Sequence, residues 1–131
     1  MALGGCGSPV RGSGNGLTIW NLEWTFSDGS GAVALDTAQS DRHPDIATPV
    51  ADGGTGITSI RFPKCDRVWL DALNHEPADE TTAAAYRQVA LVSVSPTAGT
   101  AEVRYLAANG GALSDPTSGS RTRLTLRLER P

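Results

Sequence analysis

The sequence has little lysine, little methionine and few aromatic residues. Its 131 residues include one lysine against ten arginines, a single methionine and two cysteines, and aromatic residues make up 5%.

No stretch reaches the roughly 20 consecutive apolar residues of a membrane-spanning helix, and residues 1–16 contain no apolar run typical of a secretory signal. We therefore expect no membrane partner and a reducing cytoplasm as the place of synthesis.

The charge balance is mildly acidic. Nine Asp and five Glu outweigh the basic residues and give a formal net charge of −3. Without a broad cationic field there is nothing to hold a phosphate backbone, so we expect no nucleic-acid partner. The 15 Gly and 8 Pro instead indicate many short elements joined by turns.

The two cysteines, Cys6 and Cys65, are far apart in the sequence. They can pair only if the N-terminal segment folds back beside Cys65, and a reducing cytoplasm favours two free thiols. Neither has a second cysteine nearby of the kind that forms a zinc knuckle.

No motif for catalysis or cofactor binding is present. A nucleophile elbow, a Walker loop and a zinc-protease helix are all missing, and the only histidines are His43 and His75. A small hydrolase that uses one of these histidines is a third, disfavoured hypothesis. We predict no catalytic residue and no cofactor.

Two acidic segments resemble cation sites but are more typical of solvated loops. We considered two candidate ligand sets, namely Asp36, Asp41, His43 and Asp45, and then Asn74, His75, Glu76, Asp79 and Glu80. Oxygen ligands of this kind suit a hard cation, yet carboxylates in loops are usually just hydrated. We predict no metal.

The chain divides into a flexible N-terminal arm and one domain. Residues 1–16 contain six Gly and few aliphatic residues, so they form no element alone and become ordered only when something holds them. Residues 17–131 carry the strand patterns. A domain of this length is large enough to bury one hydrophobic core.

Two segments alternate most clearly between apolar and polar residues, the period of a half-buried strand. They are Leu17–Phe26, with Trp20, Leu22, Trp24 and Phe26 on one face, and Arg121–Arg130, with Leu124, Leu126 and Leu128 on one face. Both apolar faces are predicted to pack into the core.

The remaining segments are predicted to add further short strands. We expect strands at Ala32–Leu35, Ile46–Val50, Ile57–Phe62, the alternating Val68, Leu70 and Ala72, Tyr86–Ser95 and Thr100–Ala107. Tyr86–Ser95 is almost continuously apolar, which is typical of an inner strand covered on both faces. Asn74–Ala85 is predicted as a loop with one short helical turn capped by Asp79. The fold class is all-β, a two-sheet antiparallel, jelly-roll-like β-sandwich.

The three tryptophans leave an alternative function open. Exposed indoles stack on sugar rings, so Trp20, Trp24 and Trp69 permit a carbohydrate-binding or receptor-binding module. Trp20 and Trp24 share the apolar face of one strand, which favours core burial over sugar binding.

The order of turns and strands from Gly53 to Pro131 is also informative. It runs through Gly53–Ile57, Ile60–Pro63, Arg67–Leu70, Ala98–Val103, Asp115–Gly119 and the terminal amphipathic strand. In this it resembles small β-sandwich virion proteins of bacteriophages, above all the decoration (cement) proteins of tailed-phage heads, and more distantly trimeric jelly-roll modules of the complement globular-head type.

That resemblance implies a structural virion protein. Such a protein sits on the outside of a phage head, often as a homotrimer, and stabilises the shell by bridging neighbouring major capsid proteins. An arm that orders on docking suits that role. The partner interface is predicted at Met1, Leu3, Val10 and Arg11 of the arm and at Arg123, Arg127 and Arg130 of the last strand.

Overall fold

The computed structural model describes residues 16–79, 81, 83–108 and 111–130. Its strands are β1 (Leu17–Phe26), β2 (Val33–Leu35), β3 (Val50–Asp52), β4 (Ile57–Arg61), β5 (Arg67–Glu76), β6 (Arg87–Ser95), β7 (Thr100–Ala107) and β8 (Arg121–Glu129). The predicted arm residues lie outside the described part of the chain, apart from Gly16, and so does Cys6.

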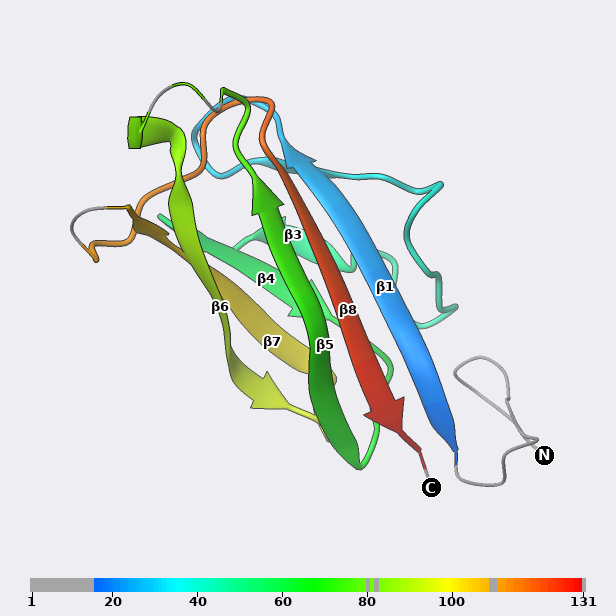
Figure 1. Cartoon of the computed structure of the whole chain (residues 1–131). Helices are drawn as coiled ribbons and strands as arrows, with labels where there is room; N and C mark the ends of the chain where they lie inside the picture. The colour runs from blue at the N-terminus through cyan, green and yellow to red at the C-terminus, as the bar shows by residue number, and fades with distance from the viewer. Residues whose placement is uncertain (1–15, 80, 82, 109–110, 131) are drawn as a thin grey trace.

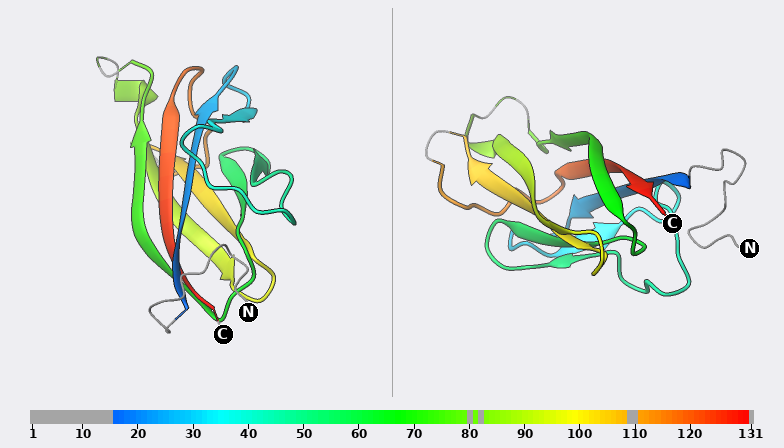
Figure 2. Two further views of the ribbon diagram at one scale, coloured as in Figure 1. Left: turned by 90° about the vertical axis from the view of Figure 1, so that its right-hand side faces the viewer. Right: turned by 90° about the horizontal axis from the view of Figure 1, so that it is seen from below.

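The strands form two antiparallel four-stranded sheets that pack face to face (Figures 1 and 2). One sheet has the order β2-β1-β8-β5 and the other β3-β4-β7-β6. The all-β, two-sheet antiparallel sandwich predicted from the sequence is therefore confirmed. The side of a sheet that faces the other sheet is called its inner face below, and the opposite side its outer face.

The first and last strands are central neighbours in one sheet. Their antiparallel register runs from Leu17 opposite Glu129 to Thr25 opposite Arg121. Successive side chains of a strand point to opposite sides, so alternate residues of both strands reach the inner face. The predicted apolar faces are both buried there, comprising Trp20, Leu22, Trp24, Phe26, Leu124, Leu126 and Leu128.

The second sheet supplies the other half of the core. Its buried residues are Val50, Ile60, Phe62, Ala101, Val103 and Tyr105, and they form one cluster with those of β1 and β8. Cys65 is buried in the same cluster. Since Cys6 lies outside the described residues, the state of this cysteine pair stays a prediction.

The alternation predicted for Val68, Leu70 and Ala72 is wrong after Leu70. A β-bulge shifts the register of β5 against β8 between Leu70 and Ala72, so Ala72 lies opposite Thr125 and Leu73 opposite the buried Leu124. One extra residue on one strand exchanges its two faces beyond that point. The residue inserted at the bulge is Asp71.

The prediction that Tyr86–Ser95 is an inner strand is also wrong. Strand β6 lies at the edge of its sheet and pairs only with β7. Val89 and Leu91 pack against the core, whereas Val94 is exposed beyond a second irregularity, where Ser93 has a positive φ of 54°. An apolar run alone does not distinguish these two positions, because an edge strand still packs one face on the core.

The strand predicted at Ile46–Val50 begins later in the structure than expected. No strand forms at Ile46, which instead makes an isolated bridge with His43, and β3 begins at Val50. Pro49 has no N–H to donate to a ladder, so a strand does not continue through it.

The predicted loop at Asn74–Ala85 is partly strand, since β5 continues to Glu76. The short helical turn is confirmed as the 3₁₀ helix η2 (Ala83–Ala85), and Asp79 accepts the Thr81 backbone N–H just before it. No helix among the described residues is long and apolar enough to cross a membrane.

Truncating the core should cost much more stability than truncating the outer face. Leu126 is fully buried at the centre of the sandwich, so Leu126→Ala is expected to lower the free energy of unfolding by about 3 kcal/mol. Ile19 of β1 is 46% exposed, and Ile19→Ala should cost less than about 1 kcal/mol. Urea unfolding of both variants tests this, and equal losses would contradict the assignment of faces.

Candidate functional site

The outer face of the β2-β1-β8-β5 sheet carries most of the ion pairs among the described residues. Strand β8 presents Arg121, Arg123, Thr125, Arg127 and Glu129 there, on the opposite side from its buried leucines. This places the predicted interface residues Arg123 and Arg127 on one surface. Arg130 follows β8 and lines a different hollow.

At one end of this outer face, a buried carboxylate forms ion pairs with two arginines. Glu23 of β1 is 6% exposed, and its two oxygens contact Arg121 Nη1 at 3.2 Å and Arg123 Nε at 3.0 Å. Burying the carboxylate requires such partners. Arg123 is therefore already engaged within the chain and is less available to a partner than the sequence suggested.

The segment after β2 covers the free edge of β1 beside Glu23. The Asp36 backbone N–H donates to the Glu23 carbonyl, and the Ser40 hydroxyl accepts the Glu23 backbone N–H. The Asp41 carboxylate accepts the backbone N–H of Asn21 at 2.6 Å. Asp41 thus supports the strand edge.

At the other end of this face, β1, β5 and β8 enclose a hollow of about 410 Å³, lined by Leu17, Trp69, Leu70, Asp71, Arg127 and Glu129. We call it the Trp69 hollow. The indole of Trp69 is 41% exposed, and Leu70 is exposed beside it. Apolar side chains left open to water in this way mark contact sites more often than scattered single residues do.

Charged groups surround the apolar floor of the Trp69 hollow. Arg127 Nη2 lies 3.2 Å from Asp71 Oδ2, and Arg67 Nε lies 3.5 Å from Glu129 Oε1. Exposed pairs of this kind add little to stability, but they leave donors and acceptors at the rim for a ligand.

The three tryptophans differ in their burial. Trp20 and Trp24 are in the core, where Trp20 Nε1 donates to the Arg61 carbonyl at 3.2 Å, and their predicted burial is confirmed. Trp69 is the exposed one. Sequence reasoning did not find the hollow, because its lining comes from three strands whose order in the sheet no local pattern contains.

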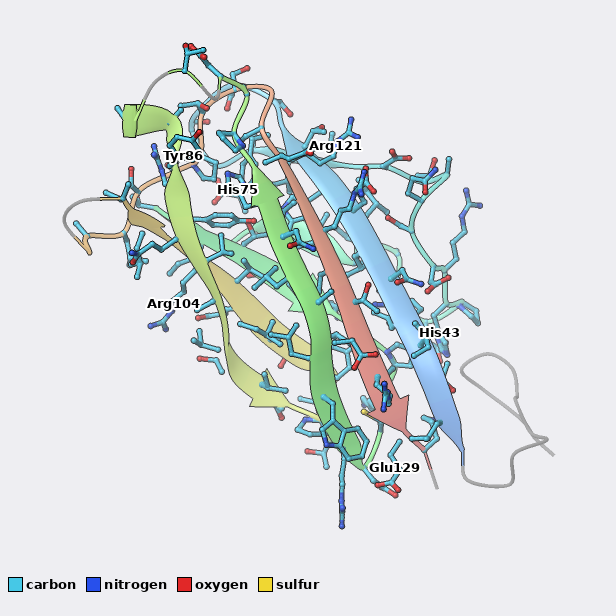
Figure 3. The ribbon with its side chains drawn as sticks, viewed as in Figure 1. His43, His75, Tyr86, Arg104, Arg121 and Glu129 are labelled. Carbon is cyan, nitrogen blue, oxygen red and sulfur yellow. The ribbon has the colours of Figure 1, made fainter. Side chains whose placement is uncertain are left out.

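The two histidines lie apart, His75 on β5 and His43 on the opposite side of the sheet beside β1 (Figure 3). His43 Nδ1 accepts the Asp45 backbone N–H at 3.1 Å. The described residues contain no group of three or more His, Cys, Asp or Glu placed to hold a metal ion.

His75 belongs to a polar chain inside the core. Its Nδ1 is 2.8 Å from Thr122 Oγ1, which is 2.8 Å from Tyr105 Oη, and Trp24 Nε1 donates to Tyr105 Oη at 3.2 Å. Thr122 is fully buried, so the pair of Thr122 and His75 presents no hydroxyl nucleophile to a substrate. The chain connects β5, β8, β7 and β1 and joins the two sheets.

Burial changes the pKa of the two titratable members of this hydrogen-bonded series. It raises the pKa of Tyr105 to about 12 and, aided by the nearby positive charge of Arg87, lowers the pKa of His75 to about 4. His75 Nε2 is buried with no hydrogen-bond partner among the described residues. His75 is thus neutral in the folded protein at neutral pH.

No family model, curated protein or solved structure matches this chain.

The neutral His75 should make stability fall in mild acid. The unfolded chain takes up a proton on His75 near its usual pKa of 6.5, whereas the folded protein does so only near 4. Stability is therefore fully present above about pH 6.5 and is lost as the pH falls towards 4. The full pKa shift would correspond to a larger loss in the free energy of unfolding. Because the ring is only partly buried, solvent screens part of this effect, and we expect a loss on the order of 2 kcal/mol.

Urea unfolding between pH 7.5 and 4.5 measures this loss when wild type is compared with His75→Gln. Wild type should lose more stability than His75→Gln as the pH falls, because only wild type carries the partly buried imidazole. Parallel losses in the two proteins would show that other groups cause the acid sensitivity.

Proposed function

We propose that this protein is a non-enzymatic structural protein of a virus particle, a decoration protein on the outside of a phage head that bridges neighbouring major capsid proteins as a homotrimer. The resemblance of Gly53–Pro131 to such proteins suggests the class. The β-sandwich is compatible with it, although this fold also serves many other roles.

The observation that carries the proposal is the position of the Trp69 hollow. Leu17 lines the hollow and follows directly after the Gly-rich arm. A capsid protein that contacts the hollow therefore lies within reach of the arm as well. Exposed tryptophan, arginine and aliphatic groups within one patch have the composition of protein interfaces.

Arg127 is the predicted interface residue best placed for this contact. Its guanidinium is at the rim of the hollow and pairs with Asp71, which is itself accessible. A partner carboxylate can compete for the planar guanidinium. The predicted contributions of Met1, Leu3, Val10 and Arg11 fall outside the described residues.

Removing the exposed indole should weaken attachment to the particle. Trp69→Ala is expected to reduce binding to heads assembled without this protein by at least tenfold, because an aromatic anchor at the centre of a patch dominates its affinity. The matched control is Tyr86→Ala, which removes a ring that is 43% exposed at the far end of the molecule (Figure 3). Co-sedimentation with heads gives the affinity, and native mass measurement gives the expected trimer.

Absence of binding by the wild-type chain would refute the proposal. Equal losses in the two variants would remove the Trp69 hollow from the interface.

The exposed Trp69 also favours a second candidate, a carbohydrate-binding module. An indole with Asp71, Arg127 and Glu129 around it offers one stacking surface and several hydrogen-bonding groups, which is the arrangement a sugar ring needs.

Tryptophan fluorescence against a glycan panel distinguishes the two candidates. A sugar-binding module should show a saturable change in emission that Trp69→Ala abolishes and Tyr86→Ala retains, since the other two indoles are buried. A decoration protein should show no change with any glycan.

A further inference from the structure

A second hollow, of about 450 Å³, lies where the second sheet meets the chain after β8. Four separate segments contribute to it, represented by His43, residues 61–64 at the end of β4 and just beyond it, Ala98 and Arg130. We call it the basic hollow. It does not share a lining residue with the Trp69 hollow, so it is independent of the function proposed above.

Positive charge is concentrated in the basic hollow. Its lining includes Arg61, Lys64 and Arg130 against one carboxylate, that of Asp45, in a chain whose formal net charge is −3. Within the described part of the chain, none of the three cations lies within 4.0 Å of a carboxylate oxygen.

Most of the other arginines among the described residues pair with carboxylates. These five are Arg67, Arg104, Arg121, Arg123 and Arg127. Three cations that line one hollow repel each other, because like charges at short range are unfavourable. A negatively charged ligand would relieve this repulsion.

The backbone that carries these cations is fixed by hydrogen bonds. The Arg61 N–H donates to the Pro49 carbonyl at 2.8 Å, and the Arg130 N–H donates to the Gly16 carbonyl at 3.0 Å. Beside Lys64, the Phe62 N–H donates to the carbonyl of Gly99 at 3.0 Å. A rigid support lowers the entropy lost when long side chains close on a ligand.

Gly99 lies in the turn between β6 and β7 and lets this turn approach the backbone of Phe62 and Lys64 closely. Its φ is +69°, and a Cβ at this position would collide with the Phe62 carbonyl oxygen. Only glycine combines this backbone conformation with so close an approach.

His43 adds a hydrogen-bond donor to the wall of the basic hollow. Because its Nδ1 accepts the Asp45 N–H, Nε2 carries the ring proton and can donate. The side chain is only 13% exposed, so the ring is held in place.

We propose that the basic hollow binds the phosphate group of a small phosphomonoester, with Arg61, Lys64 and Arg130 as the charge partners. Three cations favour a dianion over a single carboxylate. The volume exceeds that of phosphate alone and falls in the range of small-ligand pockets, which leaves room for the organic part of an ester. Phe62, Pro63 and Ala98 provide apolar walls for it.

Two-dimensional ¹H–¹⁵N NMR of the full chain at constant ionic strength tests the proposal. Trp20 Nε1–H is a natural reporter, since it donates to the Arg61 carbonyl. Inorganic phosphate and glycerol 3-phosphate should each produce saturable shifts of this indole signal and of the Lys64 and Arg130 amides. Acetate should bind at least tenfold more weakly.

The two phosphate arms identify the source of the group. Binding of glycerol 3-phosphate at least fivefold tighter than inorganic phosphate supports the ester. Equal affinities support free phosphate as the ligand of the same site and overturn the ester part of the proposal.

Matched variants locate the site. Arg61→Gln, Lys64→Gln and Arg130→Gln should each weaken phosphate binding at least threefold, and the triple variant should abolish it. Arg104→Gln removes one charge from an exposed pair elsewhere and should leave the affinity unchanged. Unchanged melting temperatures without ligand confirm that the variants fold, because none of these cations forms an ion pair with another described residue.

Shifts that do not saturate, equal responses to acetate and phosphate, or equal losses in Arg104→Gln and the three hollow variants would each overturn the proposal. These results would leave the interface at the Trp69 hollow untouched, since capsid attachment is measured with different residues.

Discussion

The dry layer between the two sheets is the feature on which every other part of this protein depends. The inner faces of β1 and β8 bury large apolar side chains against those of β4 and β7 in one cluster. Each fully buried side chain of this kind contributes roughly 1.5–3 kcal/mol relative to an exposed one. Because a strand alternates sides, burying Leu126 and Trp20 also commits their neighbours to the outer face.

A polar chain inside the core adds specificity to this layer. Hydrogen bonds between Trp24, Tyr105, Thr122 and His75 join strands of both sheets, so any other alignment of the sheets would break them. Buried polar networks are costly unless their members are satisfied, and one nitrogen of His75 has no partner among the described residues. The partial burial of His75 that accompanies this packing lowers the pKa of its imidazole to about 4.

Both hollows proposed as binding surfaces lie where strands end or change register. The Trp69 hollow includes Asp71, the extra residue of the bulge in β5, beside Trp69, Leu70 and the start of β1. The basic hollow lies at the ends of β4 and β8, where Arg61 closes one strand and Arg130 follows the other. In both places the strands provide a rigid frame for the side chains of the lining.

The all-β class, the strands at Leu17–Phe26 and Arg121–Glu129 and the burial of Trp20 and Trp24 followed from the sequence, because a period of two is a local property that neighbouring residues display. The edge position of β6, the bulge in β5, the pairing of Arg123 with Glu23 and the convergence of Arg61, Lys64 and Arg130 did not follow from it. These features depend on contacts between residues far apart in the chain, which no local pattern contains and which only the packing of the two sheets sets.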